Sequence, residues 1–160
     1  MTWEPELEEL RQRQALAREM GGPDKIARQR AAGRLTVRER IGTLLDAGSF
    51  HEIGSITGNG AYDETGALQS MTPTNFLFGR GRIEGRRVVV AGDDFTVRGG
   101  ASDASIIEKQ VAAEQMAHEL RLPMIRLIEG SGGGGSVKSL EAMGYTYVPF
   151  LPGFDHMVRN

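Results

Sequence analysis

A run of glycines toward the end of the chain is the feature best suited to chemistry. Residues 130–135 read GSGGGG, so Ser131 supplies their only side chain larger than a hydrogen atom. A short apolar stretch precedes the run and predicts a strand covered on both faces, through Met124, Ile125, Leu127 and Ile128. With a helix predicted after it, the loop offers bare backbone N–H groups, which can hold a phosphate or an oxyanion.

One phosphate-binding motif is excluded by its register. Gly130 and Gly135 have the spacing of a P-loop, but Ser136 and Val137 stand where that motif requires lysine and then serine or threonine. Lys138 comes two positions too late, and the lysine of a P-loop must reach the outer phosphates of the nucleotide.

Three other interpretations of the glycine run stay open on the residues alone. The run matches the GxGxxG pattern of a dinucleotide-binding loop, and Asp155 lies at a suitable distance for the ribose, although Pro149 and Pro152 interrupt the strand expected between them. The composition also fits a flexible linker. Finally, two N–H groups at a strand-to-helix turn can form an oxyanion hole, which stabilises the enolate of a thioester.

Other polar residues give weaker signals. The three histidines, His51, His118 and His156, have no metal-ligand spacing, so we expect no metal. Asp93 and Asp94 are candidates for an acid–base pair, but neighbours on a strand point to opposite faces. A basic cluster is expected to be either a solvated face or a contact with a ligand phosphate or partner subunit, through Arg28, Arg30, Arg34, Arg38 and Arg40.

Composition places the chain among ordinary globular proteins. Its 160 residues suit one domain, and the net charge of −2 indicates no strong attraction to nucleic acid or membranes. It contains no cysteine and starts without the apolar segment of a secretory signal, so we expect a cytoplasmic location. No apolar run is long enough to span a membrane.

The first half of the chain predicts three helices. Helix-forming residues fill 4–20 and 24–33, with Gly21, Gly22 and Pro23 between them. A capping box of Thr36 and Glu39 predicts a third helix, whose apolar face carries Val37, Ile41, Leu44 and Leu45. A strand over 50–56 and a long polar loop over 57–74 are expected to follow.

The second half predicts strands and one long helix. Residues 76–83 and 87–91 are expected to pair as a hairpin, and the continuous Val88–Val90 indicates a central strand. A short strand is expected over 93–97. Residues 103–121 predict the longest helix, apolar on two faces, with Ile106, Ala113, Met116, Ala117 and Leu120 on one and Ala104, Ile107 and Val111 on the other.

Three blocks in order resemble the carboxyltransferase (β) subunits of acyl-CoA carboxylases, such as those for propionyl-CoA and methylcrotonyl-CoA. They are KIARQRAAGRLTVRERIGTLLDAGSFHEIG, GRGRIEGRRVVVAGDDFTVRGGAS and LPMIRLIEGSGGGG, which together cover Lys25 to Gly135. The resemblance implies an α/β, crotonase-like (ClpP/crotonase) fold of ββα units, incomplete here and preceded by N-terminal helices. It divides the chain into a helical arm, 1–48, and a partial carboxyltransferase domain, 49–160.

The resemblance also implies site residues. Gly132 and Gly133 would donate backbone N–H groups to the thioester oxygen. The acyl-CoA side would be lined by Gly99, Gly100, Ala101, Ser102 and Gly134. Glu129 and Gly130 stand where the family has aspartate and serine, so this chain departs from the family pattern at the start of the glycine run.

The implied activity is transfer of a carboxyl group from carboxybiotin, carried on a separate domain or subunit, to an acyl-CoA. The implied partners are acyl-CoA, a biotin carboxylase with its biotin carrier, and further copies of the chain in a homo-oligomer. Because the family's biotin half-site lies in a later domain, we expect the chain to be the N-terminal part of a longer enzyme and inactive alone. A dinucleotide-binding domain of an oxidoreductase and a non-catalytic CoA-binding or assembly module remain the alternatives.

Overall fold

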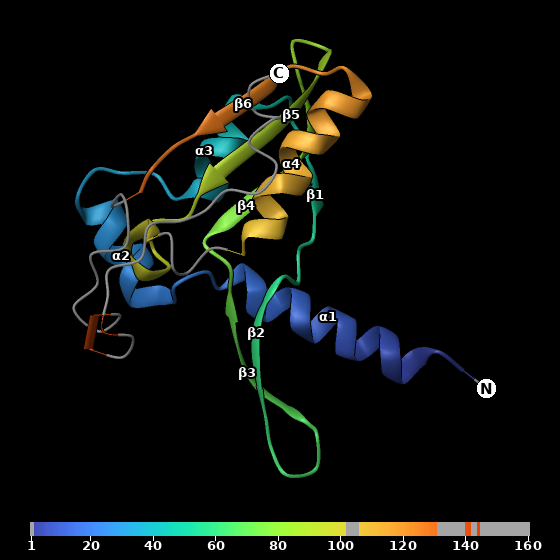
Figure 1. The fold of residues 1–160 in the computed structure, drawn as a ribbon, viewed down its shortest axis with the longest axis vertical. Coiled ribbons are helices and arrows are strands. Elements are labelled where there is room, and N and C mark those ends of the chain that lie inside the picture. Colours follow the sequence, from blue (N-terminus) through green and yellow to red (C-terminus); the bar gives the residue numbers. More distant parts are fainter. Residues whose placement is uncertain (1, 102–105, 131–139, 142–143, 145–160) are drawn as a thin grey trace.

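A four-stranded sheet with a helix on each face forms the centre of the molecule (Figure 1). The computed structural model describes residues 2–101, 106–130, 140–141 and 144. The strand order is β1 (His51–Ile53), β4 (Phe76–Ile83), β5 (Arg86–Asp93) and β6 (Met124–Leu127). The first three strands pair antiparallel, and β6 pairs parallel to β5. Helices α3 (Val37–Leu44) and α4 (Ile107–Leu120) cover the two faces.

The alternation of side chains along β5 builds two apolar clusters, one on each face of the sheet. Val88 and Val90 point to the face that α3 covers, where they pack with Val37, Ile41, Leu45 and Leu77. Val89 and Ala91 point to the other face, where they pack against α4 with Phe76, Phe78, Ala113 and Ala117. The central position of this strand and its hairpin with β4 are confirmed.

The capping box of α3 is also confirmed. The Glu39 backbone N–H donates to Thr36 Oγ1 at 3.3 Å, and the Thr36 N–H donates to Glu39 Oε2 at 2.7 Å. The bond from the Thr36 N–H, together with the Arg30 guanidinium and the Thr36 hydroxyl, lowers the pKa of Glu39 to about 2. The two helices before it, α1 (Glu4–Arg18) and α2 (Pro23–Ala31), are separated at the predicted glycines.

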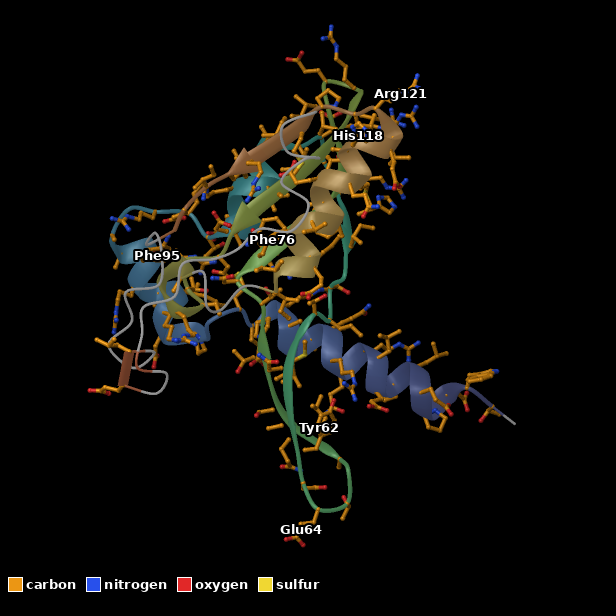
Figure 2. The ribbon with its side chains drawn as sticks, in the orientation of Figure 1. Tyr62, Glu64, Phe76, Phe95, His118 and Arg121 are labelled. Atoms are coloured by element: carbon orange, nitrogen blue, oxygen red, sulfur yellow. The ribbon has the colours of Figure 1, made fainter. Side chains whose placement is uncertain are left out.

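The prediction of a long loop over 57–74 is wrong. This segment forms a hairpin of β2 (Gly58–Tyr62) and β3 (Leu68–Pro73), which extends away from the central sheet beside α1. Figure 2 shows Tyr62 and Glu64 on this hairpin. Arg13 of α1 donates to the Tyr62 hydroxyl at 2.8 Å and lies 5.5 Å from its ring centroid. A distant helix therefore helps to stabilise two strands that are too polar and glycine-rich to be recognised by propensity.

Other element boundaries differ from the prediction. The strand expected over 50–56 is only His51–Ile53, and the one expected over 93–97 is absent, because β5 runs on to Asp93 and a turn follows it. Helix α4 begins at Ile107, since Ile106 is extended and donates its N–H to Thr74 Oγ1 at 3.2 Å. With 14 residues, α4 is shorter than α1, which has 15. Residues 102–105 lie outside the described part.

The strand before the glycine run is confirmed, but it is less buried than expected. All four residues of β6 are half-buried, and Ile128 lies beyond its end with 73% of its surface exposed. On α4, Ala113 and Ala117 are buried as expected, whereas Leu120 on the same predicted face is 48% exposed. Of the helix predicted after the glycine run, the structure describes Leu140 and Glu141, and both are helical; the rest of it falls outside the described residues.

A buried lysine in the first turn of α4 contacts the loop after β1. Lys109 is 6% exposed and its Nζ donates to the Gly54 carbonyl oxygen at 2.9 Å. Nearby, Arg38 forms an ion pair with Glu52 at 2.8 Å. Desolvation lowers the pKa of Lys109 to about 8, against the attraction of the Glu52 carboxylate. The charged form of Lys109 is therefore disfavoured in the folded protein.

Replacing this lysine is expected to change how stability depends on pH. With a folded pKa of about 8 and an unfolded value of 10.5, the unfolded chain binds more protons between these values, so the free energy of unfolding rises with pH across that window. Lys109→Met removes this rise, which is roughly 3 kcal/mol at most. Urea unfolding at pH 7.5 and 10.5 measures it, with the exposed Lys25→Met as the control. Equal pH slopes for Lys109→Met and the unsubstituted protein would contradict the assignment.

Candidate functional site

The turn after β5 is shaped by one buried carboxylate. Asp94 is 1% exposed, and its Oδ1 accepts hydrogen bonds from the Thr96 N–H at 2.9 Å and from the Thr96 hydroxyl at 2.6 Å. Aspartate side chains that bind the backbone two residues on are typical of tight turns. The turn leads into a 3₁₀ segment, η1 (Arg98–Gly100), in which Gly99 and Gly100 have φ of 64° and 67°.

The environment of Asp94 disfavours its charge. Burial raises the pKa of Asp94 above its ordinary value, although the hydrogen bonds from Thr96 and the charge of Arg38 act in the opposite direction. Its Oδ2 is buried and has no hydrogen-bond partner within the described residues. Through its other oxygen, which accepts both hydrogen bonds from Thr96, the carboxyl group stabilises the turn.

This turn packs directly against the start of the glycine run. A Cβ atom on Gly100 would lie 2.5 Å from the Glu129 carbonyl oxygen and 3.0 Å from Gly130 Cα, so only glycine fits there. Asp93 Oδ2 accepts a hydrogen bond from the Glu129 N–H at 3.2 Å. The two segments that the sequence singled out thus meet at the carboxyl ends of the parallel strands β5 and β6.

Of the predicted site residues, the structure places three. Gly99 and Gly100 lie in the turn, and the Ala101 carbonyl oxygen that follows accepts a hydrogen bond from the buried Asn75 side chain at 2.7 Å. The remaining ones lie outside the described residues: Ser102, Gly132, Gly133 and Gly134.

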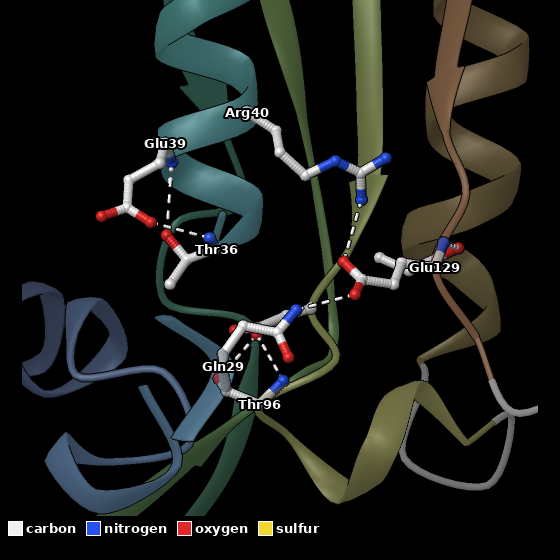
Figure 3. A network of polar contacts seen from close by, with 8 residues as sticks. Gln29, Thr36, Glu39, Arg40, Thr96 and Glu129 are labelled. Atoms are coloured by element: carbon white, nitrogen blue, oxygen red, sulfur yellow. Dashed lines mark hydrogen bonds and ion pairs between the residues drawn. The ribbon is translucent and has the colours of Figure 1, made fainter. Parts of the chain in front are cut away.

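The side chain of Glu129 is fixed by the N-terminal helices. The Gln29 side-chain amide of α2 donates to it at 2.7 Å, and the Arg40 guanidinium of α3 forms an ion pair with it at 3.1 Å (Figure 3). Gln29 is itself buried. Helices α2 and α3 therefore hold Glu129, the residue just before the glycine run, although they lie about 90–100 residues earlier in the sequence.

A basic hollow lies beside this turn. It has a volume of about 370 Å³, and four cationic side chains line it together with an aromatic ring: Lys25, Arg28, Arg34, Arg98 and Phe95. The guanidinium of Arg34 lies 5.8 Å from the centroid of the Phe95 ring. Gly99 also lines the hollow, so the glycine turn and the positive charges face one space. Such a combination suits an anionic ligand with a planar group.

The structure divides the basic cluster seen in the sequence. Arg38 and Arg40 are half-buried in ion pairs, and Arg30 pairs with Glu39 at 2.6 Å. Only Arg28 and Arg34 of that cluster face the hollow. The other lining residues were not predicted, because they come from a helix start and from the turn 70 residues later. The helical spacing of Lys25 and Arg28 does indicate that these two lie on one face of a helix.

The other polar candidates have structural roles or lie apart. Asp93 and Asp94 each bind a different backbone N–H, so they form no acid–base pair. His51 begins β1 and His118 lies on α4, while His156 is outside the described part. Within the described ranges, no group of histidine and acidic residues has the arrangement of a metal site.

Comparison with known proteins identifies the family. The model of the carboxyl transferase domain matches residues 28–148. This range includes the capping box of α3, the turn after β5 and the glycine run. The chain belongs to the carboxyl transferase domain family.

Individual relatives agree with this assignment. The chain is 35% identical, over its whole length, to the carboxyltransferase subunit of a propionyl-CoA carboxylase of Haloferax mediterranei, of which it covers 36%. It is 35% identical to a probable biotin-dependent acyl-coenzyme A carboxylase beta2 subunit of Mycobacterium tuberculosis, with 82% of this chain and 24% of that protein covered. The chain thus spans about a third or less of the length of these relatives.

Solved structures give the same fold. Transcarboxylase 12S, whose structure was solved as a hexamer with methylmalonyl-coenzyme A bound, matches with a TM-score of 0.70 and 28% identity over 90% of this chain and 29% of that one. A single-chain long-chain acyl-CoA carboxylase matches with a TM-score of 0.69 and 26% identity over 96% of this chain. The crotonase-like α/β fold expected from the sequence is confirmed. The chain spans part of that fold. The dinucleotide-binding alternative receives no support.

None of the helices in the described part of the chain is both long enough and apolar enough to cross a lipid bilayer.

Substitutions of Asp94 should separate its hydrogen bonds from its charge. Asp94→Ala leaves the Thr96 N–H and hydroxyl without their acceptor in a buried site, so we expect a loss of about 2–3 kcal/mol in the free energy of unfolding. Asp94→Asn keeps an oxygen acceptor and removes only the ionisable group, so its loss should be under about 1 kcal/mol at pH 7. Denaturant unfolding of both variants measures the difference. If Asn costs as much as Ala, the charge itself stabilises the turn and our account of it is wrong.

Proposed function

We propose that this chain forms the acyl-CoA half of a biotin-dependent carboxyltransferase, which transfers a carboxyl group from carboxybiotin to an acyl-CoA. The observation that carries the proposal is the contact of Gly100 with Glu129 and Gly130, because it joins a glycine turn to the glycine run beside a basic hollow. The family membership of the chain supports the same reaction class.

The basic hollow suits the nucleotide end of coenzyme A. Coenzyme A carries a diphosphate and a 3′-phosphate, and Lys25, Arg28, Arg34 and Arg98 offer the matching positive charge. The Phe95 ring offers an aromatic surface on which the adenine can stack, with the Arg34 guanidinium close to it. From this hollow, the pantetheine arm would extend along the turn of Gly99, Gly100 and Ala101 toward Ser102 and Gly134.

The reacting thioester would lie in the glycine run. In our proposal, the N–H groups of Gly132 and Gly133 donate to the thioester oxygen as it becomes an enolate oxyanion. Bound carboxybiotin would supply the carboxyl group that the enolate carbon accepts, and the biotin nitrogen freed when its N–C bond breaks would take up the proton that this carbon has lost. The residues of this chain bind the acyl-CoA and stabilise charge on its oxygen, and the proposal assigns the biotin side to a domain outside these 160 residues.

The remaining parts of the proposal follow from the relatives. A biotin carboxylase with its biotin carrier is the proposed partner, as the biotin-dependent relative suggests. Homo-oligomers are proposed because transcarboxylase 12S assembles as a hexamer. The division into an arm, 1–48, and a partial catalytic domain, 49–160, and a cytoplasmic location belong to the same proposal.

The activity is tested in the complete polypeptide that contains this chain. Labelled bicarbonate incorporation into acetyl-, propionyl- and methylcrotonyl-CoA, with a biotin carboxylase, its carrier and ATP added, should exceed a control without the polypeptide. These 160 residues alone should incorporate none. Incorporation by the isolated chain, or none by the complete polypeptide with any acyl-CoA, would contradict the proposal.

The hollow is tested by separating phosphate contacts from acyl contacts. Arg28→Ala combined with Arg34→Ala should raise KM for the acyl-CoA by about 10–100-fold, because each lost charge-assisted contact is worth roughly 1.5–3 kcal/mol before solvent exposure weakens it. The matching acyl-pantetheine, which lacks the nucleotide phosphates, should react equally with both enzymes. Arg11→Ala on α1 is the control for general charge effects. A KM that rises equally for both substrates would place the phosphates elsewhere.

A further inference from the structure

A second basic hollow lies at the other end of the sheet. In the antiparallel ladders His51 is directly opposite Arg80, and Arg82 is directly opposite Arg87, so all four side chains share one face. This is the face that α4 covers, because Val89, the partner of Arg80, packs against α4. Together with Leu120 and Leu122, these four residues border a hollow of about 460 Å³, which we call the arginine groove.

The charge of the arginine groove is not compensated by the described part of the chain. Like charges directly opposite each other destabilise a sheet. The Arg82 side chain donates to the Gly85 carbonyl oxygen at 2.9 Å, whereas the guanidinium groups of Arg80 and Arg87 have no hydrogen bond or ion pair to a described residue. All three arginines are exposed. The groove therefore favours an anionic partner.

One wall of the arginine groove is apolar. Helix α4 ends there, and Leu120 is 48% exposed while Leu122 is half-buried. Figure 2 shows His118 and Arg121 at this end of α4, far from Phe95 beside the candidate site. A small inorganic anion gains nothing from exposed leucines, since apolar burial needs an apolar partner. The groove thus suits a segment that is both acidic and apolar.

The start of α1 has these properties. Trp3, Leu7 and Leu10 follow the i, i+4, i+7 spacing of one helix face and are 74%, 47% and 39% exposed. Glu6 and Glu4 flank this stripe on its two sides, and neither has a hydrogen bond or ion pair to a described residue. This half of the helix packs against little else, since Ala17 is the one buried residue that α1 contributes.

A helix of the same molecule does not reach the groove. Figure 1 shows α1 extending away from the central sheet, with the N-terminus far from the end of α4. Its C-terminal end is held by Ala17 and by the hydrogen bond from the Gly21 N–H to Thr96 Oγ1 at 3.0 Å. We propose that the first turns of α1 from one copy of the chain dock into the arginine groove of a second copy. The contact is heterologous, so repeated copies form a closed ring or a filament.

A disulfide between two copies tests the contact directly in the complete polypeptide. These 160 residues contain no cysteine, and any cysteine elsewhere in the polypeptide is first replaced by serine, so that the introduced thiols report on chosen positions. Leu7→Cys in one preparation and Leu120→Cys in another should form a mixed disulfide on gentle oxidation, at least about tenfold faster than Leu7→Cys with Leu35→Cys, because docking raises the effective concentration of the thiols. Leu35 is 49% exposed and so matches Leu120 in accessibility.

A charge exchange tests the electrostatics. Arg80→Glu with Arg87→Glu should slow the mixed disulfide about tenfold or more, and Glu4→Arg with Glu6→Arg in the other copy should restore it. Arg86→Glu is the matched control, because Arg86 precedes Arg87 on the strand and points to the opposite face. Sedimentation of the same mixtures measures association of the copies, which should weaken and recover together with the rate of disulfide formation.

Three results would overturn the proposal. The first is a mixed disulfide no faster than that with Leu35→Cys when all native charges are present, a comparison that does not depend on the folding of the charge variants. The second is a failure of the exchanged charges to restore the rate in variants that keep the circular dichroism of the folded protein. The third is binding of inorganic phosphate at the arginine groove while copies do not associate, which would make it a site for a small anion.

Discussion

The close approach of Gly100 to the Glu129 carbonyl is the constraint on which the candidate site depends. A side chain at position 100 would collide with the backbone from which the glycine run begins. The contact forms only because Asp94 turns the chain after β5 and because Gly99 and Gly100 accept positive φ. A buried carboxylate and two glycines thus determine where the loop starts relative to the sheet.

The N-terminal helices complete this constraint. Gln29 and Arg40 hold the Glu129 side chain, and the Gly21 N–H donates to Thr96 in the turn. Ion pairs near the surface contribute little to the free energy of unfolding. The main effect of these contacts is therefore to position Glu129 and the turn after β5 relative to the helices. The helical segments before β1 are therefore part of the site, and the same helices bring Lys25, Arg28 and Arg34 to the basic hollow.

The sequence predicted those parts in which neighbouring residues determine the structure. The capping box of Thr36 and Glu39 needs only four residues, and the run Val88–Val90 indicates a central strand by itself. The β2–β3 hairpin was missed because it is stabilised by Arg13, 49 residues before Tyr62. The turn at Asp94 was predicted as a strand, since its β-forming residues outweighed the aspartate–backbone bonds that shape it.

The candidate site was predicted in part for the same reason. Glycine patterns and the family resemblance located the turn at Gly99–Ala101 and the glycine run, and the structure brings the start of that run against the turn. Lys25, Arg98 and Phe95 were missed because no local pattern links a helix start to a turn some 70 residues later. They line one hollow only because the fold places α2 beside the end of β5.

Kinetics of Gly100→Ala in the complete polypeptide test the central claim most directly. The matched control is Gly66→Ala, because Gly66 has φ of 84° and open space around it, so it carries the backbone strain without the collision. We expect kcat/KM for acyl-CoA carboxylation to fall about 100-fold in Gly100→Ala, as displacement of a reacting group by about 1 Å can cause, and to stay near the original value in Gly66→Ala. Near-normal kcat/KM in Gly100→Ala would contradict the account, since the turn would then not position the glycine run.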